Sequence, residues 1–142
     1  MASIFTRIIR GELPARFVWQ DKLCVAFLSN RPLRPGHTLV VPRAEVDHWL
    51  DAEPELLGHV MQTAQVIGKA QMVAFRPNRI GMMIAGLEVP HLHVHVVPIR
   101  GVHDLDFSNQ DASPDPDAMD RAAASIRLEL RALGFTEAAG PD

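Results

Sequence analysis

Residues 91–98 read His-Leu-His-Val-His-Val-Val-Pro, and this alternation constrains the chain more than any other segment. Side chains on a β-strand point alternately to its two faces, so the aliphatic residues are expected to pack inward while the imidazoles form a row on the other face. Histidine is seldom a core residue, and three in register add no packing that Val or Thr would not supply better. The pattern predicts a strand that presents three side chains for chemistry: His91, His93 and His95.

A metal site is the first chemistry to consider, because histidine is the commonest metal ligand and zinc catalysis often uses three of them. At about 3.3 Å per residue, the outer two Cα atoms of this row would lie about 13 Å apart. Three rings could then converge on one ion, at Zn–N distances of about 2.0–2.1 Å, only if the strand bent severely. No Cys-x-x-Cys or His-Glu-x-x-His motif lies nearby. We therefore expect neither a metal nor another cofactor.

Nucleophilic catalysis by imidazole is the second candidate. A neutral ring nitrogen attacks phosphorus or an acyl carbon near pH 7 when the other ring nitrogen keeps its proton on a hydrogen-bond acceptor. The middle residue, His93, is flanked by imidazoles and strand carbonyls that could serve as this acceptor, and neighbouring imidazoles could donate to an anionic oxygen. A solvated polar face on an ordinary strand is the alternative interpretation.

The chain resembles the histidine-triad (HIT) family, whose signature is His-φ-His-φ-His-φ-φ with φ apolar. The resemblance covers roughly residues 3 to 99 and includes the family's opening helix and turn, its C-x-A-F strand and its P-G-H-x-L-V-x-P strand. The matching segments, in chain order, are residues 3–14, 23–28, 35–42 and 89–98.

This resemblance implies a nucleotide-binding enzyme that cleaves a bond at the α-phosphorus of a nucleotide. His93 would attack phosphorus to give a nucleotidyl-histidine intermediate, which water or an acceptor phosphate then discharges. His91 would orient the nucleophile, and His95 would bind the phosphate and assist the leaving group. His37 matches a family histidine that supports the triad from behind. A purine nucleotide or nucleotide conjugate is the implied ligand.

The resemblance also implies an apolar slot for the base. An amphipathic first helix packing on a sheet would show the same residues, so both interpretations stay open. The slot residues would be Ile4, Phe5, Ile8, Phe27 and Leu28.

Three positions depart from the family pattern near the substrate. Ser29 stands where many members have an Asp that holds the ribose hydroxyls. Leu87 stands where an amide would contact the phosphate or leaving group. Glu88 stands near a position that is often Ser or Thr in the family. It could donate a proton to a leaving group if burial raised its pKa, or its negative charge could repel a phosphate-rich substrate.

The sequence predicts an α+β fold: a HIT-like, about five-stranded, mainly antiparallel sheet with helices packed on one side and an extra C-terminal helix. Ser3 is expected to cap the N-terminus of a short helix that ends at Gly11. Asp51 or Glu53 is expected to cap the N-terminus of a long helix. The long helix begins near Pro54 and continues to about Phe75, with Met72 on its apolar stripe. The expected strands are residues 17–20, 23–28, 37–41, 80–85 and 92–99.

Residues 1–100 are expected to form the HIT domain, and residues 101–142 an acidic, solvated linker and a C-terminal helix. That helix begins at Asp115-Pro116, and its apolar stripe runs from Met119 to Leu133. The stripe could pack on its own domain, cover the site or reach a partner, and the resemblance implies a homodimer. Calcium binding is not expected, because the Gly and Glu of a calcium loop are missing.

Composition is consistent with one globular domain: 142 residues, 47% hydrophobic, with a net charge of −3. We expect no nucleic-acid partner, because basic runs are absent. We also expect no membrane association and a cytoplasmic location, because neither a signal peptide nor an 18-residue apolar run is evident. The single cysteine, Cys24, is interpreted as a small core residue, and His48 and His59 as structural or solvent-facing.

Three functions stay open. The first is a nucleotidyl-transferring hydrolase of nucleoside phosphoramidates or related adenylyl compounds. The second is a dinucleoside polyphosphate hydrolase, which would need extra cations. The third is a non-catalytic nucleotide sensor. The candidate cations are Arg31, Arg34, Arg43, Arg79 and Arg100.

Overall fold

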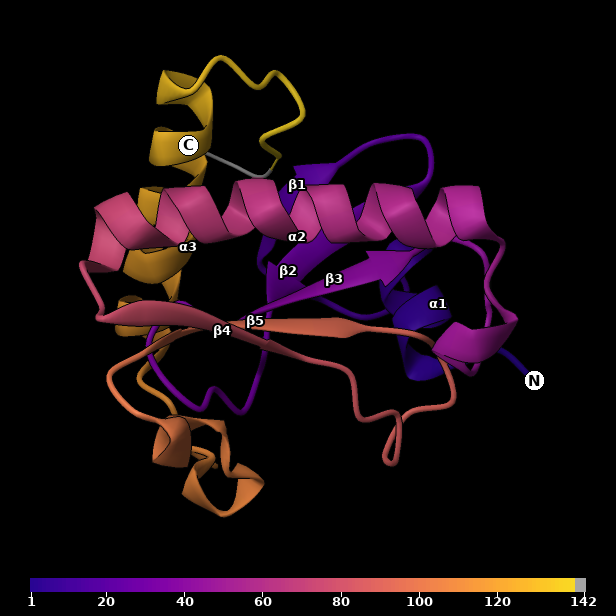
Figure 1. The fold of residues 1–142 in the computed structure, drawn as a ribbon, viewed down its shortest axis with the longest axis horizontal. Coiled ribbons are helices and arrows are strands. Elements are labelled where there is room, and N and C mark those ends of the chain that lie inside the picture. Colours follow the sequence, from indigo (N-terminus) through magenta and orange to yellow (C-terminus); the bar gives the residue numbers. More distant parts are fainter. Residues whose placement is uncertain (140–142) are drawn as a thin grey trace.

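The computed structural model describes residues 1–139, and its centre is one five-stranded antiparallel sheet in the order β1-β2-β3-β5-β4 (Figure 1). The predicted α+β fold is confirmed. The three α-helices are α1 (Ile4–Ile9), α2 (Pro54–Phe75) and α3 (Pro116–Ala132). The strands are β1 (Phe17–Gln20), β2 (Cys24–Leu28), β3 (Thr38–Pro42), β4 (Arg79–Met83) and β5 (Val94–Ile99).

The histidine-bearing segment enters the sheet later than predicted. Strand β5 begins at Val94, whereas the sequence pattern predicted a start at Leu92. The reason is that the backbone N–H of Leu92 donates to the carbonyl of Val46, outside the sheet, and that of His91 donates to Val89 in a tight turn. Only His95 of the three triad residues therefore lies in the strand itself.

The two long helices cover one face of the sheet, and Figure 1 shows α2 running along it. Val60 and Ile67 of α2 and Ile126 of α3 join one core cluster with strand residues such as Val94. The short helix α1 packs against the opposite face, where Phe5 belongs to a second cluster. The prediction of helices on one side is thus correct for α2 and α3 and wrong for α1.

The ends of α1 follow the predicted capping, whereas Glu53, the residue before α2, makes no capping hydrogen bond with its side chain. The Ser3 side chain accepts a hydrogen bond from the backbone of Thr6, and Gly11 follows α1 with φ +81°, a conformation that costs glycine little. Two residues of the predicted apolar stripes are exposed instead of buried: Met72 of α2 is 41% exposed and Leu133, after α3, is 49% exposed.

The acidic segment after β5 is folded onto the domain. It forms two 3-10 turns, Val102–Leu105 and Phe107–Asn109. Asp104, expected in a solvated linker, is buried, because its Oδ2 accepts the backbone N–H of Arg100 at 2.8 Å. These turns bring Phe107 and the following residues to the histidines. Within residues 1–139, no helix is long and apolar enough to cross a membrane.

Candidate active site

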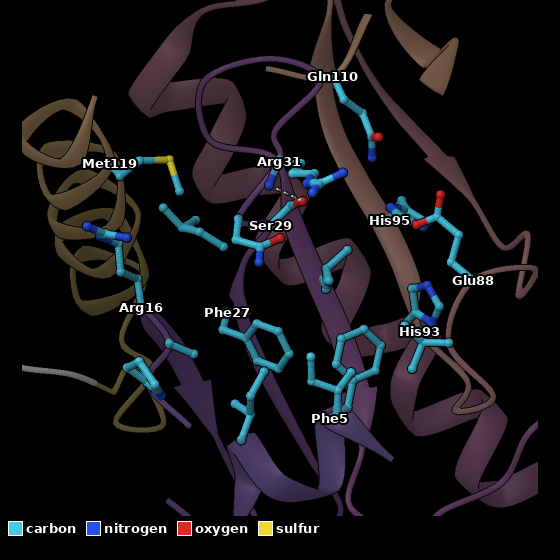
Figure 2. Close-up of a pocket in the computed structure, with 18 residues that line it drawn as sticks. Phe5, Arg16, Phe27, Ser29, Arg31, Glu88, His93, His95, Gln110 and Met119 are labelled. Atoms are coloured by element: carbon cyan, nitrogen blue, oxygen red, sulfur yellow. Dashed lines mark hydrogen bonds between the residues drawn. The ribbon is translucent and has the colours of Figure 1, made fainter. Parts of the chain in front are cut away.

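One cleft, of about 200 Å³, brings together most of the predicted site residues (Figure 2). His93 and His95 lie on one side of it and apolar side chains on the other. Two predicted residues, His91 and His37, do not line the cleft and lie behind it. The predicted substrate-binding residues that line it are Ile4, Phe5, Ile8, Phe27, Leu28, Ser29 and Glu88.

His93 presents one free ring nitrogen to the cleft. Its Nδ1–H donates to the carbonyl of His91 at 2.7 Å, so Nε2 carries a lone pair. The Phe5 ring meets the His93 ring edge-on, with centroids 4.9 Å apart. Burial lowers the pKa of His93 below the ordinary 6.5, and the ring is therefore neutral at pH 7. A neutral imidazole with its other proton fixed is a competent nucleophile.

His95 is oriented by a chain of hydrogen bonds that begins at the backbone. The N–H of Leu33 donates to Nδ1 of His37 at 3.0 Å, so the proton of His37 is on Nε2. This Nε2–H donates to Nδ1 of His95 at 2.9 Å, which places the His95 proton on its own Nε2. His95 is consequently a hydrogen-bond donor toward the cleft.

His37 and His95, the two histidines in this chain of hydrogen bonds, are neutral at pH 7. Burial, together with the nearby rings of His95 and His93, lowers the pKa of His37 to about 3. Burial and the neighbouring His93 lower the pKa of His95 to about 4. Because His37, His93 and His95 carry no positive charge at pH 7, there is no charge repulsion among the three rings.

His91 is fully buried and is held at both ring nitrogens. Its Nε2–H donates to the carbonyl of Pro42 at 2.8 Å, so Nδ1 accepts from the Ser3 hydroxyl at 2.6 Å. The Ser3 backbone N–H and the Thr6 hydroxyl both donate to Glu45 Oε1, at 2.6 and 2.7 Å. These two hydrogen bonds lower the pKa of Glu45 to about 2. The network ties α1 to the residue whose carbonyl orients His93.

Sequence reasoning missed several residues that lie at the site. The Phe107 ring lies 5.2 Å from the His95 ring, centroid to centroid. Gln110 and Met119 line the cleft together with Arg16, and Figure 2 shows Gln110 near Arg31 and His95. All but Arg16 lie beyond the triad in sequence. Phe107 and Gln110 fall in the segment that was expected to be a solvated linker, and coverage of the site by the helix that carries Met119 was one of three alternatives.

The positions that depart from the family pattern fall in different places. Leu87 is 92% exposed and is not among the residues that line the cleft, so no group there takes the place of the amide. Glu88 and Ser29 do line it. Of the five candidate arginines, only Arg31 lines the cleft. Arg34 and Arg100 border a separate pocket, Arg43 donates to the Asp21 carbonyl, and Arg79 is exposed at the start of β4.

Comparison with known proteins shows which family the chain belongs to. A model of the HIT domain matches residues 10–102. An uncharacterized HIT-like protein from Mycobacterium tuberculosis is 31% identical over the full length of both chains. The adenylylsulfatase HINT3 of Arabidopsis thaliana is 26% identical over 87% of this chain and 64% of that protein.

Solved structures give the same result. A zinc-bound histidine triad family protein from Mycobacterium smegmatis matches with a TM-score of 0.81 and 28% identity, over 94% of this chain and 96% of that one. The chain belongs to the histidine-triad family, a family of nucleotide-binding hydrolases and transferases.

Proposed function

We propose that this protein cleaves nucleoside phosphoramidates or related adenylyl compounds at the α-phosphorus through a covalent nucleotidyl-His93 intermediate. The observation that carries the proposal is the pair of free ring nitrogens in one cleft. His93 offers a lone pair and His95 offers an N–H, and their ring centroids are 5.0 Å apart. A nucleophile beside a hydrogen-bond donor supports displacement of an amine from phosphorus.

The first step forms a bond between His93 Nε2 and phosphorus and breaks the bond from phosphorus to the leaving nitrogen or oxygen. The leaving group takes a proton from solvent, and the His95 Nε2–H donates a hydrogen bond to it, so His95 stays neutral. Positive charge appears on the His93 ring, whose Nδ1–H still donates to the carbonyl of His91. In the second step a water attacks phosphorus and releases its proton to solvent, and the bond between phosphorus and His93 Nε2 breaks. The nucleoside monophosphate leaves and the His93 ring is neutral again.

The base is proposed to lie between α1 and the sheet. Phe5 and Phe27 form an edge-to-face pair with centroids 5.6 Å apart, and Ile4 and Ile8 line the same cleft. A flat purine matches such an apolar slot. Ser29 is proposed to contact the ribose with its short, neutral hydroxyl.

The other two functions receive less support. A dinucleoside polyphosphate would place several negative charges near the Glu88 carboxylate. Two arginines line the cleft, Arg31 and Arg16, and Arg16 already forms an ion pair with Asp120 at 2.7 Å. A non-catalytic sensor would not need an oriented nucleophile. The Arabidopsis relative suggests adenylyl sulfate as a further substrate, in which sulfate would leave instead of an amine.

A homodimer is proposed through β4 and α2. Strand β4 is a terminal strand of the sheet, and Met82 on it and Met72 on α2 are both more than two-fifths exposed. These two residues line an apolar groove with Met61 and Ile80. The opposite terminal strand, β1, already pairs with the C-terminal segment at Ala138. Light scattering should therefore give twice the mass of one chain for wild type, and Met82→Glu should lower the measured mass to that of a single chain.

The test is turnover of a fluorogenic adenosine phosphoramidate and of a diadenosine polyphosphate by wild type and His93→Ala. The variant should lose turnover by orders of magnitude and still bind adenosine monophosphate. Wild type that binds nucleotide and turns over neither substrate would favour the sensor. Activity abolished by a chelator and restored by zinc would contradict the metal-free mechanism.

A further inference from the structure

A second cluster of reactive side chains lies outside the nucleotide cleft. Asp21 lies in the turn between β1 and β2, Cys24 begins β2, and His59 projects from α2. One potential ligand atom from each, an oxygen, a sulfur and a nitrogen, lies within 4.8 Å of the other two. None of the three lines the nucleotide cleft. His59, interpreted from the sequence as structural or solvent-facing, has a partner that the sequence did not reveal: its Nε2 lies 2.7 Å from Asp21 Oδ2.

We propose that Asp21, Cys24 and His59 bind one thiophilic divalent cation, of which Zn²⁺ is the natural representative. Thiolate, imidazole and carboxylate are the three side-chain ligands of zinc in proteins, and a sulfur ligand disfavours Mg²⁺ and Ca²⁺. A water or the Thr63 hydroxyl, 3.5 Å from the Cys24 sulfur, would supply the fourth ligand.

Two distances between ligand atoms can be compared with what a tetrahedral ion needs. With Zn–S of about 2.3 Å and Zn–O and Zn–N of about 2.0 Å, tetrahedral angles separate sulfur from oxygen by about 3.5 Å and nitrogen from oxygen by about 3.3 Å. The Cys24 sulfur already lies 3.6 Å from Asp21 Oδ2. The His59 nitrogen, at 2.7 Å from that oxygen, has to withdraw by about 0.6 Å, and a partly exposed ring can do this by rotating.

The carboxylate is already oriented by its own hydrogen bonds. Asp21 Oδ1 accepts the backbone N–H groups of Leu23 and Cys24, each at 2.8 Å, and Oδ2 accepts the indole N–H of the buried Trp19 at 2.8 Å. Such outer hydrogen bonds fix ligand orientation in known metal sites. His59, whose side chain is one-third exposed, supplies the path from solvent.

Binding is balanced by proton release. The Cys24 thiol gives up its proton to solvent as the sulfur–metal bond forms, and the His59 proton that faces Asp21 leaves Nε2, either to Nδ1 or to solvent. The bound ion would connect the β1–β2 turn to α2. Its expected role is therefore stabilisation of the fold, and it takes no part in the proposed reaction at His93.

Cobalt titration tests the site, because Cys24 is the sole cysteine of the chain. A thiolate-to-cobalt charge-transfer band in the near ultraviolet can come only from this residue. We expect one Co²⁺ per chain with that band, competed away by Zn²⁺. Cys24→Ser should abolish the band, and His59→Gln should weaken binding at least tenfold. Circular dichroism would verify that each variant is folded.

Two controls separate this cluster from the triad histidines, which could also take up metal. His48→Gln removes an exposed histidine outside the cluster, and His93→Ala removes one from the cleft; both should keep the band and its affinity. Cobalt binding without a charge-transfer band, or with a band that His59→Gln leaves unchanged, would overturn the proposal. Zinc should also raise the melting temperature of wild type and not that of Cys24→Ser.

Discussion

Replacing His37 tests whether a residue behind the cleft controls the proton of His95. In His37→Leu, no group donates to His95 Nδ1, so nothing holds the His95 proton on the nitrogen that faces substrate. A hydrogen bond to a charged group contributes about 1.5–3 kcal/mol. Because about 1.4 kcal/mol corresponds to a tenfold change in rate, kcat should fall by about 10-fold to 150-fold. KM should change little, since His37 does not line the cleft.

His37→Gln is the matched control. Its amide N–H can occupy the place of the imidazole Nε2–H and donate to His95, so kcat should stay within a few-fold of wild type. Both variants leave the buried N–H of Leu33 without its acceptor, which should cost each of them about 1–3 kcal/mol of stability. Equal losses of stability with unequal losses of kcat would separate proton control from a general structural effect.

The assay is steady-state cleavage of an adenosine phosphoramidate, which gives kcat and KM, with urea unfolding measured on the same preparations. A kcat in His37→Leu equal to that of wild type would refute the idea that His37 holds the His95 proton on Nε2. So would a kcat in His37→Gln as low as that of His37→Leu, because the restored donor should then have restored the rate.

Three further predictions concern stability and specificity. Ser3→Ala removes both the N-cap of α1 and the donor to His91, and urea unfolding should show a loss of about 1–3 kcal/mol. The pKa values of His95 and His37, about 4 and about 3, lie below the 6.5 of the unfolded chain, which therefore binds more protons between these limits. Stability should then fall as pH drops from 6.5 toward 4, by up to about 1.4 kcal/mol per pH unit for each histidine, as measured by urea unfolding at several pH values. Gln110→Ala should raise KM by about 2-fold to 12-fold, as expected for loss of one hydrogen bond to substrate, in steady-state assays.

Local patterns predicted most element boundaries, because capping and periodicity involve neighbouring residues. The start of α1 after Ser3 and the start of α3 after Asp115 agree with the structure. The late start of β5 could not be predicted, because it depends on a hydrogen bond to Val46, far away in sequence. The position of α1 had a signal that went unused. Strands β2 and β3 are apolar at every position but one, and such runs indicate a sheet covered on both faces.

In the site, too, local patterns predicted some features, while contacts between residues distant in sequence determine others. The alternation of histidines correctly predicted that His93 and His95 would share a cleft, but His91 lies behind it. The hydrogen bond that holds His91 there comes from Ser3, 88 positions away, and leaves no trace in local spacing. His37 was expected behind the triad from the family resemblance alone. The pair of Asp21 and His59 had no sequence signal, because a turn and a helix meet there only after the chain folds.

Each ring proton at the proposed reaction centre is set by a backbone group that has only one hydrogen-bonding role. The Leu33 N–H can only donate, and the His91 carbonyl can only accept. Since neither can exchange roles, the first fixes the tautomers of His37 and His95 and the second fixes that of His93. The lone pair of His93 and the proton of His95 therefore face the cleft before any nucleotide arrives, and substrate binding does not have to supply the energy to arrange them.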